Sequence, residues 1–133
     1  MPVAEANKLA ASDELLMRQV HPNFMLQEGR LWSGAFTPTK MDNGLLSADR
    51  ESLISPKDAY ERYLAAKALT QAGGSWGVSI NEFKELDLAC YSDPVAGNDA
   101  HVLVDFAAKG AEKEKGLGKL AYAKANARGR LYP

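Results

Sequence analysis

Short strand-like and helix-like segments alternate along this chain, and their order restricts the fold more than any single motif does. The strongest strand pattern is the valine-rich run at 101–106 (HVLVDF), and the strongest helix pattern covers about 56–72, with Ser55 as N-cap and Pro56 in the first turn. The full order is helix, strands, helix, strand, helix, strand, helix. We therefore expect one α+β domain over residues 1–133, with a small mixed sheet of about four to five short strands covered by about three to four helices.

The other elements are assigned from apolar spacing and turn residues. Further strands are expected at 31–37, 45–49, 75–80 and 89–91, a short helix after Asn81, and a last helix at about 115–128 within a basic C-terminal helical segment, 112–130. The alanine-rich residues 1–12 form a short helix or fray. Residues 14–21 (ELLMRQVH) fit a helix slightly better than a strand, and His21-Pro22 ends it.

Composition excludes several classes of protein. The chain has 133 residues, of which 46% are hydrophobic and 25% charged, as in an ordinary globular domain. One cysteine, Cys90, excludes an internal disulfide framework. No apolar run approaches the ~18 residues of a membrane span, and the N-terminus lacks a signal-peptide pattern. We expect a cytoplasmic protein without membrane association.

Charge is distributed unevenly although the net charge is only −1. Residues 109–130 contain seven basic and two acidic side chains and carry +5, so the remainder carries −6. This basic tail either docks on the acidic body or meets an acidic partner. Segregated charge favours steered association with a protein partner. Nucleic acid is not expected as a partner, because the sequence pI is only about 6.1.

Several motifs that would identify an enzyme are missing from the sequence. It contains no phosphate-binding glycine loop, and no GxGxxG, HExxH or CxxC. Its two histidines, His21 and His101, are eighty residues apart, and no spacing selects carboxylates to complete a metal site. Cys90 has apolar sequence neighbours, and we expect it to be a buried, unreactive thiol. We therefore expect no metal and no cofactor, and no residue is assigned as catalytic.

Binding residues are expected in the stretch 18–50. Arginine forks and hydroxyl donors bind anions, and an exposed tryptophan stacks on a ring. His101 opens a strand, where an aspartate of the 93–99 loop can orient it as a general base. The candidate binding residues are Arg18, His21, Arg30, Trp32, Ser33, Ser47, Arg50 and His101.

The same residues also have a structural interpretation. Trp32 and Phe36, four residues apart, lie on one face of the expected strand and serve as core. The arginines then pair with nearby acids such as Asp42, Asp49 or Glu51.

One group of segments resembles the start of ADP-ribosyltransferase-like folds. These are an early arginine, Arg18, the run GRLWSGAF at 29–36, LLS at 45–47 and DAYERY at 58–63. The resemblance covers about half the chain and implies that Arg18 or His21, Ser47, and Glu82 or Glu85 position a nicotinamide dinucleotide. The two glutamates of this match, in EFKE at 82–85, are spaced Glu-x-x-Glu and not Glu-x-Glu as in the family.

Two functions from different classes follow. The first is a small cytoplasmic, non-catalytic binding module, immunity-like or regulator-like, whose ligand is a protein. The alternative is a nucleotide-handling enzyme or binder that uses the 18–50 stretch and His101, with a nucleotide or phosphorylated small molecule as ligand. Convergence of Arg18, His21, Arg30 and His101 on one pocket favours the alternative, and dispersal favours the first.

Overall fold

Five strands form one antiparallel sheet in the computed structural model, which describes residues 3–133. The strands are β1 (Leu15–Gln19), β2 (Leu45–Arg50), β3 (Ser75–Ser79), β4 (Ala89–Ser92) and β5 (His101–Asp105). Their order across the sheet is β3-β1-β2-β5-β4, and each neighbouring pair is antiparallel. The expected α+β class is confirmed.

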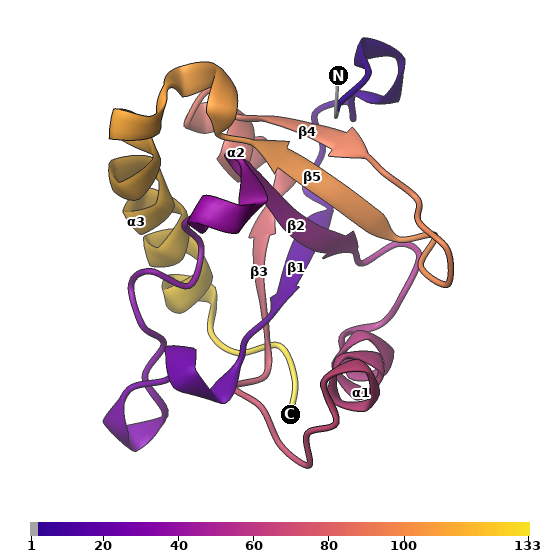
Figure 1. Cartoon of the computed structure of the whole chain (residues 1–133), viewed down its shortest axis with the longest axis vertical. Coiled ribbons are helices and arrows are strands. Elements are labelled where there is room, and N and C mark those ends of the chain that lie inside the picture. The colour runs from indigo at the N-terminus through magenta and orange to yellow at the C-terminus, as the bar shows by residue number, and fades with distance from the viewer. Residues whose placement is uncertain (1–2) are drawn as a thin grey trace.

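Three helices cover the two faces of this sheet (Figure 1). They are α1 (Pro56–Lys67), α2 (Ile80–Glu85) and α3 (Ala111–Arg128). Helices α2 and α3 pack together on one face, and α1 contacts β1 and β3 from the other side. None of the helices in residues 3–133 is both long enough and apolar enough to cross a membrane.

Strand alternation divides the buried side chains between the two faces. Leu16 and Val78 are paired neighbours with no exposed surface, and they belong to the main core with Phe83 of α2 and Ala121 of α3. Met17, the next residue of β1, points to the opposite face and is also fully buried. Both faces of β1 are therefore buried, and α1 packs on the face to which Met17 points.

Helix α1 begins where the sequence predicts and ends earlier. The Ser55 side chain accepts a hydrogen bond from the Asp58 N–H at 3.1 Å, with Pro56 in the first turn. The helix stops at Lys67 because Ala68 adopts a left-handed conformation, with φ of 54°. The expected end at residue 72 was wrong, since the chain needs residues 69–74 to return to the sheet.

Three other expectations need correction. The segment 14–21 is not helical, because β1 is hydrogen-bonded to β2 and β3 on both edges, and this pairing overrides a weak helical pattern. The segment 31–37 is not a strand: the N–H of Ala35 bonds the Trp32 carbonyl in a tight turn. Within residues 3–12 there is one 3-10 turn, Glu5–Asn7, and Leu9 donates its N–H to the carbonyl of Cys90 in β4. Residues 1–2 lie outside the described range.

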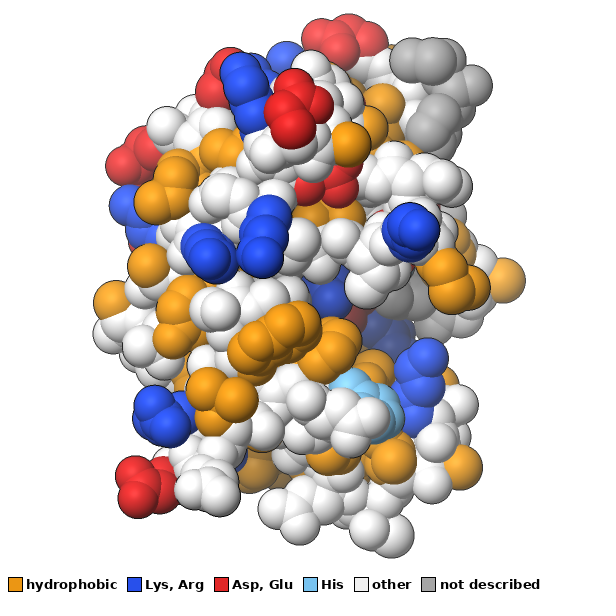
Figure 2. All heavy atoms as spheres, turned by 60° about the vertical axis from the view of Figure 1, so that its left-hand side comes forward, with side chains coloured by type: hydrophobic (Ala, Val, Ile, Leu, Met, Phe, Trp, Pro, Cys, Tyr) orange, Lys and Arg blue, Asp and Glu red, His pale blue; other side chains and the backbone are white. Residues whose placement is uncertain are grey.

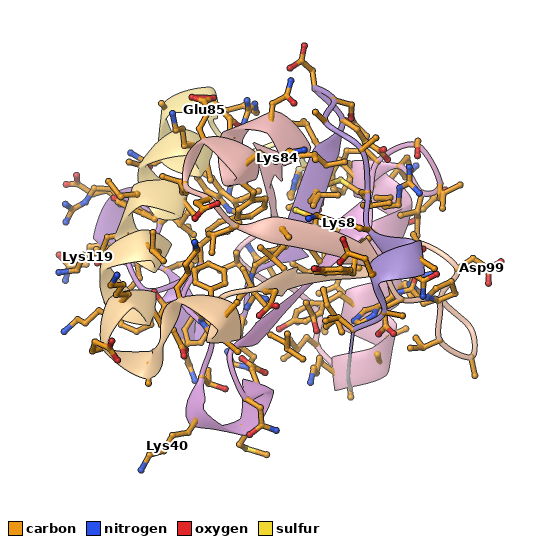
Figure 3. The ribbon with its side chains drawn as sticks, turned by 90° about the horizontal axis from the view of Figure 1, so that it is seen from above. Lys8, Lys40, Lys84, Glu85, Asp99 and Lys119 are labelled. Atoms are coloured by element: carbon orange, nitrogen blue, oxygen red, sulfur yellow. The ribbon has the colours of Figure 1, made fainter. Side chains whose placement is uncertain are left out.

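The basic tail docks on the body of the protein through part of its charge. Arg128 of α3 pairs with Glu82 at 2.9 Å and donates to the Gly77 carbonyl at 2.8 Å. Lys124 pairs with Glu85 at 3.9 Å. Figure 3 shows Lys119 pointing outward from the same helix. Part of the positive charge of the tail is therefore paired with acids of the body, and part of it faces solvent.

Two glycines of α3 provide a test of this packing. A Cβ at Gly118 would lie 2.9 Å from the Cα of Thr37, whereas a Cβ at Gly116 meets nothing within 4 Å in the described structure. We expect Gly116→Ala to raise the free energy of unfolding by about 0.5–1 kcal/mol through helix propensity. Gly118→Ala should lower it by about 1–3 kcal/mol through overpacking. Urea denaturation of both variants checks this, and equal effects would contradict the close approach of α3 to Thr37.

Candidate functional site

A cavity of about 350 Å³ lies between α1 and the sheet. Strands β1 and β2 pair only at Leu16–Arg50 and Met17–Asp49, so they diverge beyond Met17 and leave space there. The lining residues are Met17, Arg18, Gln19, His21, Phe24, Asp42, Ser47, Ala48, Asp49, Tyr63, Lys67, Asn98 and His101. Figure 2 views this side obliquely and shows a histidine next to Lys or Arg side chains beside a hollow in the surface.

Arg18 fills the gap between the diverging strands. Its Nε donates to the Ala35 carbonyl at 3.0 Å and its Nη1 to the Ser47 carbonyl at 2.7 Å. It forms no ion pair with any residue in the range 3–133. Burial lowers the pKa of Arg18, and the negative charge of Asp42 opposes that shift. A guanidinium beside a cavity with only neutral hydrogen-bond partners is poised to take an anion.

Two histidines line the same cavity from different elements. His21 follows β1 and its Nδ1 accepts a hydrogen bond from the Asn23 N–H at 3.1 Å. His101 opens β5, and its Nδ1 lies 3.0 Å from both the backbone oxygen and a carboxylate oxygen of Asp93. Asp99, the other aspartate of that loop, points away from the body of the protein (Figure 3). Asp93 is thus the aspartate that orients His101.

Two carboxylates line the cavity, those of Asp42 and Asp49, and both accept hydrogen bonds from neighbouring groups. Asp49 accepts from the Asn98 amide at 2.8 Å and lies 3.7 Å from the Arg62 guanidinium. Asp42 accepts from the backbone N–H and the hydroxyl of Thr39, at 2.7 and 3.0 Å. These contacts offset part of their negative charge, so they repel an anion less than free carboxylates would.

Gln19, Tyr63 and Lys67 are among the lining residues that the sequence analysis missed. Gln19 Nε2 is buried and has no hydrogen-bond partner in the described range, and buried donors are normally paired. Tyr63 and Lys67 reach the cavity from α1. Burial raises the pKa of Tyr63 while Arg18 lowers it, so the phenol stays protonated. The i, i+4 spacing of Tyr63 and Lys67 placed them on one helix face, but nothing in the sequence showed which face meets β1.

Four of the eight predicted binding residues line this cavity: Arg18, His21, Ser47 and His101. The other four, Arg30, Trp32, Ser33 and Arg50, do not. Arg30 is exposed, and within residues 3–133 its Nε donates to the Gln27 carbonyl alone, at 3.4 Å. Trp32 is 42% exposed, although its ring packs on Phe24 with centroids 5.3 Å apart. Trp32 therefore supports a wall residue without touching the cavity.

Arg50 belongs to a structural ion pair instead. Its Nη2 and Nε donate to the two carboxylate oxygens of Glu14 at 2.8 and 3.2 Å. The backbone N–H and the hydroxyl of Ser52 donate to the same carboxylate at 3.1 and 2.5 Å. Burial alone raises the pKa of Glu14, but these hydrogen bonds outweigh it and hold that pKa below its usual value. The network ties the start of β1 to the end of β2.

This network predicts a specific acid sensitivity. Because the pKa of Glu14 is depressed in the folded state, its stabilising contribution is present above the unfolded pKa of about 4.3 and is lost as pH falls through the lower folded value. Glu14→Gln should lower the free energy of unfolding at neutral pH by about 1–2 kcal/mol and flatten its fall below pH ~4.5. Urea denaturation across pH checks this. Glu61→Gln, at an exposed position of α1, is the matched control, and equal slopes for both variants would contradict the account.

The remaining candidates lie outside the cavity. Glu82 caps α2 by accepting from the Ser79 N–H at 2.8 Å, and it lines a separate groove with Arg128. Neither Glu82 nor Glu85 lines the cavity, so the geometry does not assemble the residues that the ADP-ribosyltransferase resemblance implies. Burial raises the pKa of Cys90 to about 12, which makes it a poor nucleophile. No cluster of three metal-ligating side chains occurs within residues 3–133.

Comparison of the chain with protein-family models, with curated proteins and with solved structures finds no match. The function is therefore inferred from the residues and geometry of the cavity.

Proposed function

We propose that this protein binds a small phosphorylated ligand, nucleotides included, in the cavity between α1 and the sheet. The observation that carries the proposal is Arg18, a guanidinium set beside the cavity with two carbonyl partners and no ion pair in the described range. A phosphate group supplies the countercharge of Arg18. Its oxygens accept hydrogen bonds from the guanidinium N–H groups that do not bond the two carbonyls. Lys67, which also lines the cavity, adds a further donor.

The size and lining of the cavity suit such a ligand. Its volume of about 350 Å³ falls within the range of small-molecule sites, roughly 300–1,000 Å³. Phe24 and Tyr63 offer aromatic faces for a base or another ring. The protein-partner function draws less support, because Arg128 and Lys124 of the basic tail are paired with acids of the protein's own body.

Thermal melting against a panel of nucleotides and phosphorylated metabolites tests the proposal. A ligand present at about 100 times its dissociation constant stabilises the fold by roughly 2.7 kcal/mol, which shifts the melting temperature measurably. We expect Lys67→Met, on the rim of the cavity, to weaken the shift and Arg30→Ala, away from it, to preserve it. If the ligand-induced shift in melting temperature is lost in Arg30→Ala and kept in Lys67→Met, the ligand binds elsewhere. If no compound of the panel shifts the melting temperature, the proposal is overturned.

A further inference from the structure

The two histidines of the cavity are fixed in opposite tautomers. His21 Nδ1 accepts the Asn23 N–H, so Nδ1 carries no proton and the neutral ring carries it on Nε2. His101 Nδ1 faces two oxygens of Asp93, which only accept, so this nitrogen carries the proton and Nε2 keeps its lone pair. The free nitrogen of His21 is therefore a donor, and the free nitrogen of His101 is an acceptor.

These two nitrogens give the cavity a donor end and an acceptor end. Arg18 lies in β1 and His21 lies two residues beyond the end of β1, and both line the cavity, so this part of the chain supplies two donors. His101 comes from β5, on the far side of β2, with the acidic Asp49 directly opposite it in the register. Where the strands are paired, β1 and β5 are two strand spacings apart, about 10 Å, and the divergence of β1 from β2 beyond Met17 widens this distance. Side chains that reach inward from both strands leave room for a ligand of the length of a sugar phosphate.

We propose that the ligand is a phosphate ester of a sugar, with its phosphate at Arg18 and His21 and a hydroxyl group donating to His101 Nε2. This inference rests on the proposed function and names the class of ligand within it. Asp49 supports the assignment, because its carboxylate lies opposite His101 and accepts a hydrogen bond from a second hydroxyl. Ribonucleoside monophosphates belong to this class, and their dideoxy forms lack the hydroxyls that His101 selects.

Calorimetric titration with the four ribonucleoside 5′-monophosphates and their 2′,3′-dideoxy forms tests the inference. At pH about 8 we expect the ribose form to bind roughly 10-fold or more tightly, because the dideoxy form leaves His101 Nε2 unpaired. His101→Phe should reduce that ratio to about one. His21→Phe, the matched control, should weaken both forms and leave the ratio intact. Equal binding of ribose and dideoxy forms to the native protein would overturn the inference while the proposed function stands, and binding of neither form would overturn the inference and count against the proposed function.

A second measurement does not depend on how well the variants fold. Long-range proton–nitrogen NMR correlations distinguish the two neutral tautomers of histidine in the native protein. We expect His21 with its proton on Nε2 and His101 with its proton on Nδ1. Finding both rings in the same tautomer would contradict the donor and acceptor ends of the cavity and overturn the inference.

Discussion

Phe36→Ala is expected to destabilise the protein by about 3–5 kcal/mol, the cost of deleting a fully buried phenyl ring. Phe36 has no exposed surface and belongs to the main core. It also follows Ala35, whose carbonyl accepts from Arg18, so the loss loosens the segment that holds the guanidinium. Chemical denaturation measures the effect.

Trp32→Ala is the matched comparison for Phe36→Ala. Trp32 stands four residues earlier and is 42% exposed, with its ring packed on Phe24. We expect a loss of only about 1 kcal/mol, since nearly half of the surface of Trp32 already faces water. Similar costs for the two variants would contradict the placement of one ring inside and the other outside.

Arg18→Met is expected to weaken binding of a phosphorylated ligand by about 100-fold, because hydrogen bonds to charged groups contribute about 1.5–3 kcal/mol. The variant fills a similar volume but leaves the carbonyls of Ala35 and Ser47 without their donor. We therefore also expect a loss of about 1–3 kcal/mol in the free energy of unfolding. Calorimetric titration with the strongest ligand from the melting panel, below the melting temperature of the variant, measures the affinity.

Arg18→Lys separates charge from geometry at the same position. Lysine keeps the positive charge but cannot donate to two carbonyls and a phosphate in one plane. We expect an affinity between those of the native protein and Arg18→Met. An affinity equal to that of the native protein for both variants would show that the ligand does not contact residue 18.

Local signals made the helices and most of the sheet predictable. Helix α1 has Ser55 as its N-cap and Pro56 in its first turn, and both act through neighbours in the chain. The valine-rich β5 and the strand β3 lie within a residue of their predicted bounds. Strand β1 was mistaken for a helix because its stability comes from pairing with β2 and β3, which lie far away in sequence.

The cavity was predictable only in part, for the same reason. Arg18, His21 and Ser47 fall in the stretch that the sequence analysis chose for its mixture of cations and hydroxyls, and His101 was chosen for its place at a strand end. Tyr63 was not chosen, because only the docking of α1 on β1 makes it a neighbour of Arg18. Gln19 follows Arg18 in the chain but is neither a cation nor a hydroxyl, so that criterion left it out. Arg30 and Arg50 carry the same charge as Arg18, and nothing in the sequence around the three arginines showed which of them lines the cavity.

The position of the ligand is the central claim, and amide NMR mapping tests it most directly. Adding the strongest nucleotide of the melting panel to the ¹⁵N-labelled protein should shift signals around the cavity, from Arg18 and Ser47 on the sheet to Tyr63 on α1. Signals of the outer face of α3, around Lys119, should stay in place. Shifts confined to α3, or no shifts with any phosphorylated compound, would contradict the account.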